Sequence, residues 1–89
     1  MIRQELTLIN RLGLHARAAA KLVATASRFS SAVRLGRTEK LADAKSIMAV
    51  MMLGASCGTT LVFETEGADE ALAMDAIASL IKDRFGEDE

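Results

Sequence analysis

The chain has 89 residues, of which 51% are hydrophobic, and a formal net charge of −1. This length supports one domain with a modest core, over residues 1–89, and leaves little room for a deep substrate cavity. One cysteine and one histidine exclude an internal disulfide and a zinc or iron site of the usual His/Cys type, so we expect no metal and no cofactor.

The first half of the chain predicts a strand, a helix and a hairpin. Apolar and polar residues alternate over residues 2–8, as in a half-buried strand, and a loop follows over residues 10–14. An apolar stripe at helical spacing predicts a helix from residue 16 to about residue 28. Residues 32–35 and 39–43 then predict two short strands joined by a glycine-containing turn.

The second half predicts a short helix, a strand and a long helix. The short helix covers residues 46–53, because a serine opens it and Gly54 closes it. Residues 59–66 alternate as in a strand, with Leu61 and Phe63 on one face. The long helix is expected from residue 68 to about residue 85, followed by a frayed tail over residues 86–89. Its expected apolar stripe consists of Leu72, Ala76, Ile77, Leu80 and Ile81.

The element order is therefore β-α-β-β-α-β-α. Short, mostly one-sided strands that include a hairpin favour an antiparallel sheet. We expect an α+β open-faced sandwich, in which a four-stranded antiparallel sheet carries three helices on one face.

Charge is distributed unevenly along the chain. Residues 1–45 carry nine Lys and Arg against three Asp and Glu, whereas residues 46–89 carry two against nine. The two halves would form solvated faces of opposite sign, or the basic half would face an acidic partner or a phosphate. Nucleic acid is disfavoured, because the chain is not basic overall and has few aromatic stacking groups. The most apolar run, residues 47–55, is too short to span a bilayer, so we expect a cytoplasmic protein without membrane contact.

His15 is the only histidine and stands at the predicted start of the first helix. A neutral imidazole is a nucleophile that titrates near neutral pH, and a helix N-terminus offers free N–H groups to an anion. Arg17, two residues later, could add charge-assisted hydrogen bonds. The pattern predicts a place that accepts and holds a phosphoryl group, although His15 could also be a simple polar cap. No acidic residue lies within nine positions of His15, so no partner for the ring is visible.

Ser46 opens the short helix and is interpreted first as an ordinary N-cap residue. A phosphate at this position would be tolerated by the helix dipole, and would add roughly −1.5 to −2 charges to the surrounding surface. It would therefore act by repulsion at an interface more than by refolding the chain.

The short helix has more apolar residues than one side of it can bury. Val50 and Leu53 are spaced to point inward together. The residues left as candidates for exposure are Ile47, Met48 and Met51. Methionines of this kind often pack in a core, but the surplus on both sides makes a partner-binding patch an equal alternative.

Two motifs about thirty residues apart give the chain a family resemblance. They are Gly13-Leu14-His15-Ala16-Arg17 and Lys45-Ser46-Ile47-Met48, accompanied by Leu53-Gly54 and Gly58-Thr59. The chain resembles over its whole length the HPr family, the histidine-containing phosphocarriers of the bacterial phosphoenolpyruvate-dependent phosphotransferase system. The family fold, a four-stranded antiparallel sheet with three helices, agrees with the order predicted above.

The resemblance implies a role for each matching residue. His15 would accept the phosphoryl group from Enzyme I and pass it to IIA domains, and Arg17 would support that site. Ser46 would match the serine phosphorylated by HPr kinase/phosphorylase where that enzyme exists. The exposed apolar docking patch of the family falls on Ile47, Met48 and Met51. The chain would be a monomeric carrier and a substrate of the phosphotransferase enzymes, not an enzyme itself.

One position departs from the family, and two other functions remain open. Ala18 stands where the family usually has proline, which leaves one more N–H donor near the site. We expect this change to tune the carrier and not to inactivate it. A nitrogen-related or purely regulatory branch of the family is one alternative, and a protein-interaction module in which His15 is only a cap is the other.

Overall fold

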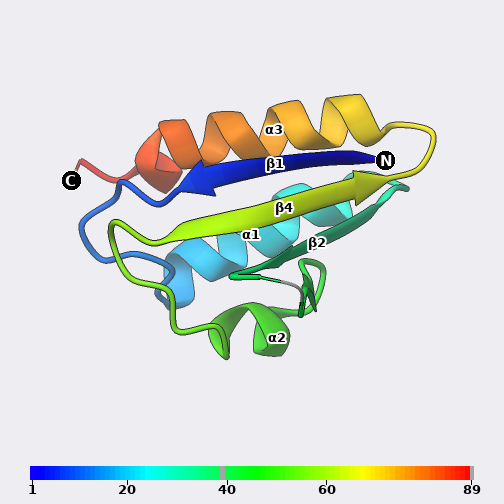
Figure 1. The fold of residues 1–89 in the computed structure, drawn as a ribbon. Coiled ribbons are helices and arrows are strands. Elements are labelled where there is room, and N and C mark those ends of the chain that lie inside the picture. Colours follow the sequence, from blue (N-terminus) through cyan, green and yellow to red (C-terminus); the bar gives the residue numbers. More distant parts are fainter. Residues whose placement is uncertain (39, 89) are drawn as a thin grey trace.

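One antiparallel sheet and its helices form the molecule (Figure 1). The computed structural model describes residues 1–38 and 40–88. The strands, in the order β1-β4-β2-β3, are β1 (Ile2–Thr7), β4 (Thr60–Glu66), β2 (Ala32–Gly36) and β3 (Ala42–Asp43). The helices are α1 (Ala16–Ser27), α2 (Ile47–Met51) and α3 (Glu70–Lys82), with a short 3₁₀ turn, η1 (Arg84–Gly86). The predicted α+β open-faced sandwich is confirmed.

Several element boundaries differ from those predicted. The second strand of the hairpin is only Ala42–Asp43, and Glu39, where it was expected to begin, lies outside the described residues. The last helix ends at Lys82 instead of residue 85, because the chain turns into η1. No helix within residues 1–38 and 40–88 is long and apolar enough to cross a membrane.

The buried face of α3 is shifted from the predicted stripe. Leu72 is 65% exposed and takes no part in the core. The buried residues of the helix are Ala73, Met74, Ile77 and Ile81. Two overlapping sets of apolar residues satisfy the helical period here, and the structure buries the set that includes Ala73 and Met74.

Strand β4 is central and buried on both faces. As predicted, Leu61 and Phe63 lie in the core beneath the helices. On the opposite face Glu64 is also buried, because Arg3 from β1 and Arg34 from β2 cover it. The Glu64 carboxylate accepts from Arg3 Nη1 at 2.7 Å and from Arg34 Nε at 3.3 Å. These pairs join two basic residues of the first half of the chain to an acidic residue of the second half.

Asp69 ties the start of β2 to the start of α3. Its carboxylate accepts hydrogen bonds from the backbone N–H of Ser30 at 3.0 Å and of Ser31 at 2.9 Å, and from the Ser31 hydroxyl. The Ser31 hydroxyl, with these backbone donors, lowers the pKa of Asp69 from 3.8 to about 2. The ionised carboxylate therefore stabilises the folded protein.

Replacing Asp69 with asparagine should make stability less sensitive to acid. A folded-state pKa below the unfolded value means that the carboxylate stabilises the fold above pH ~4. This stabilisation is lost as the pH falls from about 4 to about 2. Urea unfolding measured between about pH 4 and about pH 2 should show that the free energy of unfolding falls more steeply for the original chain than for Asp69→Asn. Asp75→Asn, at an exposed position of the same helix, is the control, and parallel curves for all three proteins would contradict the prediction.

Candidate functional site

His15 is the N-cap residue of α1, but its side chain makes no capping hydrogen bond. Its carbonyl oxygen accepts the first helical hydrogen bond, from Ala19 N at 2.8 Å. The N–H groups of Ala16, Arg17 and Ala18 come before this bond, so they have no acceptor within the helix. The His15 side chain is 27% exposed. The site therefore combines an accessible imidazole with the donor end of a helix.

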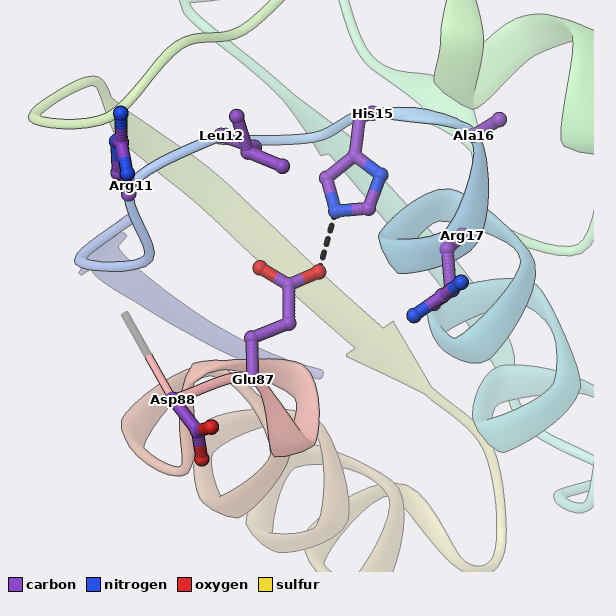
Figure 2. Close-up of a pocket in the computed structure, with 7 residues that line it drawn as sticks. All are labelled: Arg11, Leu12, His15, Ala16, Arg17, Glu87 and Asp88. Carbon is purple, nitrogen blue, oxygen red and sulfur yellow. Dashed lines mark hydrogen bonds and ion pairs between the residues drawn. The ribbon is translucent and has the colours of Figure 1, made fainter.

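His15 and Arg17 share one surface pocket of about 610 Å³ (Figure 2). Its lining residues are Arg11, Leu12, His15, Ala16, Arg17, Glu87 and Asp88. Arg17 is exposed, and its guanidinium makes no hydrogen bond or ion pair with the part of the chain that the structure describes. The structure thus brings these two side chains into one pocket, and their joint binding of an anion stays a prediction.

Glu87 supplies the partner for the ring that the sequence did not reveal. Its Oε2 hydrogen-bonds His15 Nε2, and its Oε1 accepts from Asn10 Nδ2 at 3.1 Å. Asn10 is buried and also donates to the carbonyl of Gly13 at 2.7 Å. The Asn10 amide, followed by His15, holds the pKa of Glu87 below its usual value. The prediction of a frayed tail is therefore wrong for residues 86–88, and Glu89 lies outside the described residues.

This contact selects one tautomer of His15. An ionised carboxylate only accepts hydrogen bonds, so Nε2 carries the hydrogen that it shares with Glu87. In a neutral ring, Nδ1 then holds the lone pair. Figure 2 shows this second nitrogen on the side of the ring where Ala16 and Arg17 lie. The nucleophilic atom therefore lies on the same side as the N-terminus of α1.

The turn after α3 brings Glu87 to His15. Arg84 and Phe85 have φ values of 55° and 56°, in the left-handed region that L-residues rarely adopt. Each such residue costs roughly 1–2 kcal/mol, which the complete burial of the Phe85 side chain offsets. Lys21 on α1 donates to the carbonyl of Phe85 at 2.5 Å. The chain is thus fastened to α1 just before Glu87.

The loop before His15 lies directly on the loop after α2. Gly13 has a φ of 64°, and a Cβ at this position would be 2.7 Å from the carbonyl oxygen of Ala55 and the Cα of Ser56. The N–H of Leu14 donates to the same Ala55 carbonyl at 2.9 Å. Only glycine fits here, and the contact fixes α2 relative to His15.

Ser46 and the apolar side chains of α2 lie outside this pocket. Ser46 is the N-cap residue of α2, and its Oγ accepts from the N–H of Ala49 at 3.3 Å. Val50 is buried and Leu53 is half-buried, as predicted. The exposed apolar side chains are Ile47, Met48 and Met51, as expected, together with Met52. Their use in docking stays a prediction.

Known proteins resemble this chain over its whole length. A family model described as "PTS HPr component phosphorylation site" matches residues 2–83. The phosphocarrier protein HPr of Cupriavidus necator is 54% identical over 89 residues, with all of both chains covered. The crystal structure of HPr-C-His from Thermoanaerobacter tengcongensis has a TM-score of 0.95, 43% identity and full coverage of both chains. An HPr dimer from the same organism has a TM-score of 0.78 and 44% identity, covering 98% of this chain and 100% of the other.

Proposed function

The chain belongs to the HPr family of phosphocarriers of the phosphotransferase system, and on that premise we propose that His15 carries the phosphoryl group. One observation carries the proposal: the lone pair of His15 Nδ1 faces the donor end of α1, while Glu87 holds Nε2. The phosphoryl group would come from Enzyme I, which takes it from phosphoenolpyruvate, and would pass to IIA domains.

The chemistry of the site follows from these positions. The Nδ1 lone pair attacks the phosphorus atom, an N–P bond forms, and the bond between phosphorus and the donor breaks with its electron pair leaving on the donor. The N–H groups of Ala16, Arg17 and Ala18 and the Arg17 guanidinium bind the phosphoryl oxygens. Glu87 accepts the hydrogen bond from Nε2–H and stabilises the positive charge that develops on the ring. One arginine and a few amides form a modest anion site, which suits a group that must leave again.

The first experiment tests His15 as the acceptor. The purified chain is incubated with Enzyme I, magnesium and phosphoenolpyruvate, and its intact mass is measured. We expect one added phosphoryl group, labile in acid and stable in base, that maps to His15. An acid-stable adduct, or one on another residue, would contradict the proposal. If no adduct forms while a control HPr is labelled, Ala18 is the first suspect, and the interaction-module alternative gains support.

Replacing Glu87 with glutamine should slow transfer at saturating donor by about tenfold, because the neutral amide stabilises the charged ring less. The KM for the donor should change little, because Glu87 does not need to touch the partner. In ¹⁵N NMR the His15 ring should lose its strict Nε2–H tautomer, which a merely structural role would not alter. Asp83→Asn makes the same charge change at an exposed residue and is the control. An unchanged kcat with an unchanged tautomer would refute the role of Glu87.

We also propose Ser46 as a regulatory phosphorylation site, for HPr kinase/phosphorylase where that enzyme exists. Ser46 begins the helix whose apolar residues would form the docking surface. A phosphate there would therefore repel a partner without altering the pocket of His15. The docking residues under this proposal are Ile47, Met48 and Met51.

Ser46→Asp should lower the rate of phosphoryl transfer from Enzyme I by about tenfold at low salt, corresponding to about 1.4 kcal/mol of docking energy. Aspartate and asparagine both cap helices well, so Ser46→Asn keeps the cap without the charge and is the matched control. Initial rates are compared at two ionic strengths, because the effect should shrink as salt screens the charge. Equal rates for the two variants at low salt would refute electrostatic interference.

The remaining parts of the proposal concern the state of the chain. We propose a monomeric, cytoplasmic substrate of the phosphotransferase enzymes that transfers phosphate without catalysing another reaction. Sedimentation at several concentrations tests the monomer, against the precedent of the HPr dimer from Thermoanaerobacter tengcongensis. Neighbouring genes separate sugar transport from the nitrogen-related or regulatory branch.

A further inference from the structure

Three of the five methionines lie together on the surface. Met48, Met51 and Met52 are 69%, 41% and 81% exposed, whereas Met74 in the core is 3% exposed. Side chains three and four positions apart are neighbours on a helix, so these three residues form one continuous surface, called here the methionine patch. None of them belongs to the buried core. These three residues are therefore accessible to reagents in solution.

We propose that the methionine patch is a reversible oxidation site that controls docking on α2. The inference rests on the proposed function, because it assigns a regulation to the same docking surface. Oxidation of the patch would weaken the encounter between the carrier and its partners, and reduction would restore it.

The reaction needs a hydroperoxide as oxidant. A sulfur lone pair attacks the terminal peroxide oxygen, an S–O bond forms and the O–O bond breaks. The proton on the attacked oxygen passes to the departing oxygen, which leaves as water or an alcohol, and the sulfoxide remains. The sulfur is oxidised by two electrons and the peroxide is reduced by two. The sulfoxide is returned to the thioether by methionine sulfoxide reductases, which draw electrons from thiols.

The change of polarity acts on docking. A flexible thioether adapts to different apolar partners, whereas a sulfoxide is polar and must lose its water when a partner covers it. The His15 pocket contains no methionine, so the chemistry of transfer is not directly altered. The fold should also persist, because α2 is anchored by the buried Val50 and capped by Ser46.

The sequence offers matched controls. Cys57 is an exposed thiol that also reacts with peroxide, so every protein carries Cys57→Ser. Leucine gives a similar apolar surface without an oxidisable atom, so the triple variant Met48→Leu, Met51→Leu, Met52→Leu is compared only with itself, before and after peroxide. Met74 reports the fold, because it should stay unoxidised while the protein remains folded.

In the test, the Cys57→Ser protein is treated with hydrogen peroxide until peptide mapping shows three sulfoxides at the methionine patch and none at Met74. Initial rates of phosphoryl transfer from Enzyme I are then measured against carrier concentration. We expect KM to rise about tenfold or more, because three apolar contacts become polar, with kcat within about twofold. Reductases for both sulfoxide epimers should restore KM, and the triple leucine variant should show the same KM before and after peroxide.

Each other outcome counts against the inference. An unchanged KM in the trisulfoxide protein would overturn it, as would an equal loss in the peroxide-treated leucine variant. Early oxidation of Met74, or a large fall in the melting temperature, would show damage to the fold in place of control of docking. If the untreated protein accepts no phosphoryl group, the proposed function fails and this inference fails with it, a result that is distinct from normal transfer unaffected by peroxide.

Discussion

Replacing His15 with alanine should give a folded protein that accepts no phosphoryl group from Enzyme I. The chain has one histidine, so no second imidazole can substitute for it. The helix start does not depend on the ring, because the His15 side chain makes no capping hydrogen bond and only the backbone carbonyl takes part in α1. We therefore expect transfer to fall below detection while stability changes by no more than about 1 kcal/mol.

The loss of phosphoryl transfer is measured by the intact mass after incubation with Enzyme I and phosphoenolpyruvate. The change in stability is measured by urea unfolding. His15→Asn is the companion variant, because asparagine is a good N-cap residue without nucleophilic character. Both variants should be folded and unphosphorylated. An acid-labile adduct on either variant would place the acceptor elsewhere in the chain.

Truncating Phe85 to alanine should destabilise the protein by about 3–5 kcal/mol. The side chain is completely buried and belongs to the core cluster. Burial of the Phe85 ring offsets the energetic cost of the left-handed backbone at Arg84 and Phe85. The truncation removes that offset, so the turn should no longer be stable. Glu87 should then leave His15, and transfer should slow as expected for Glu87→Gln.

Urea unfolding measures the loss of stability in Phe85→Ala. The release of Glu87 is measured by the rate of phosphoryl transfer, at a temperature where the variant is still folded. Leu72→Ala removes a large apolar side chain from an exposed position of α3 and should cost no more than about 0.5 kcal/mol. Phe85→Leu keeps most of the apolar volume and should lose less than the alanine variant. A loss under about 1 kcal/mol for Phe85→Ala would show that the turn is held by something else.

Local patterns predicted most of the fold. Alternation in β1 and β4 and the helical period in α1 depend on neighbours a few residues away, and these elements lie where expected. The end of α3 depends on packing between distant segments. Gly86 indicates that the helix ends near here, but nothing in the local sequence places Arg84 and Phe85 in the left-handed region, and the burial of the Phe85 ring in the core favours that turn.

The candidate site likewise contains residues that the local sequence predicts and residues that only the packing of distant segments brings in. His15 and Arg17 could be predicted together because both lie within two residues of one helix start. Glu87 is 72 positions from His15, and its path to the ring runs through the unpredicted turn. The available signal was Gly86 followed by three acidic residues, Glu87, Asp88 and Glu89, but this pattern does not say toward which part of the molecule the chain turns. Asn10 was placed in a loop, and its burial beneath Glu87 has no sequence signature.

The close packing of Gly13 on Ala55 and Ser56 affects how partner proteins would bind to the carrier. Under the proposed function, His15 and α2 are held at a fixed spacing, so every partner that docks on α2 would have to match that spacing. The donor, Enzyme I, and the recipient, a IIA domain, would then compete for the same surface and could not bind the carrier at the same time. Each transfer would need a separate binding event, after which the carrier dissociates. The concentration of free carrier would then determine the overall rate of phosphoryl transfer between the partners.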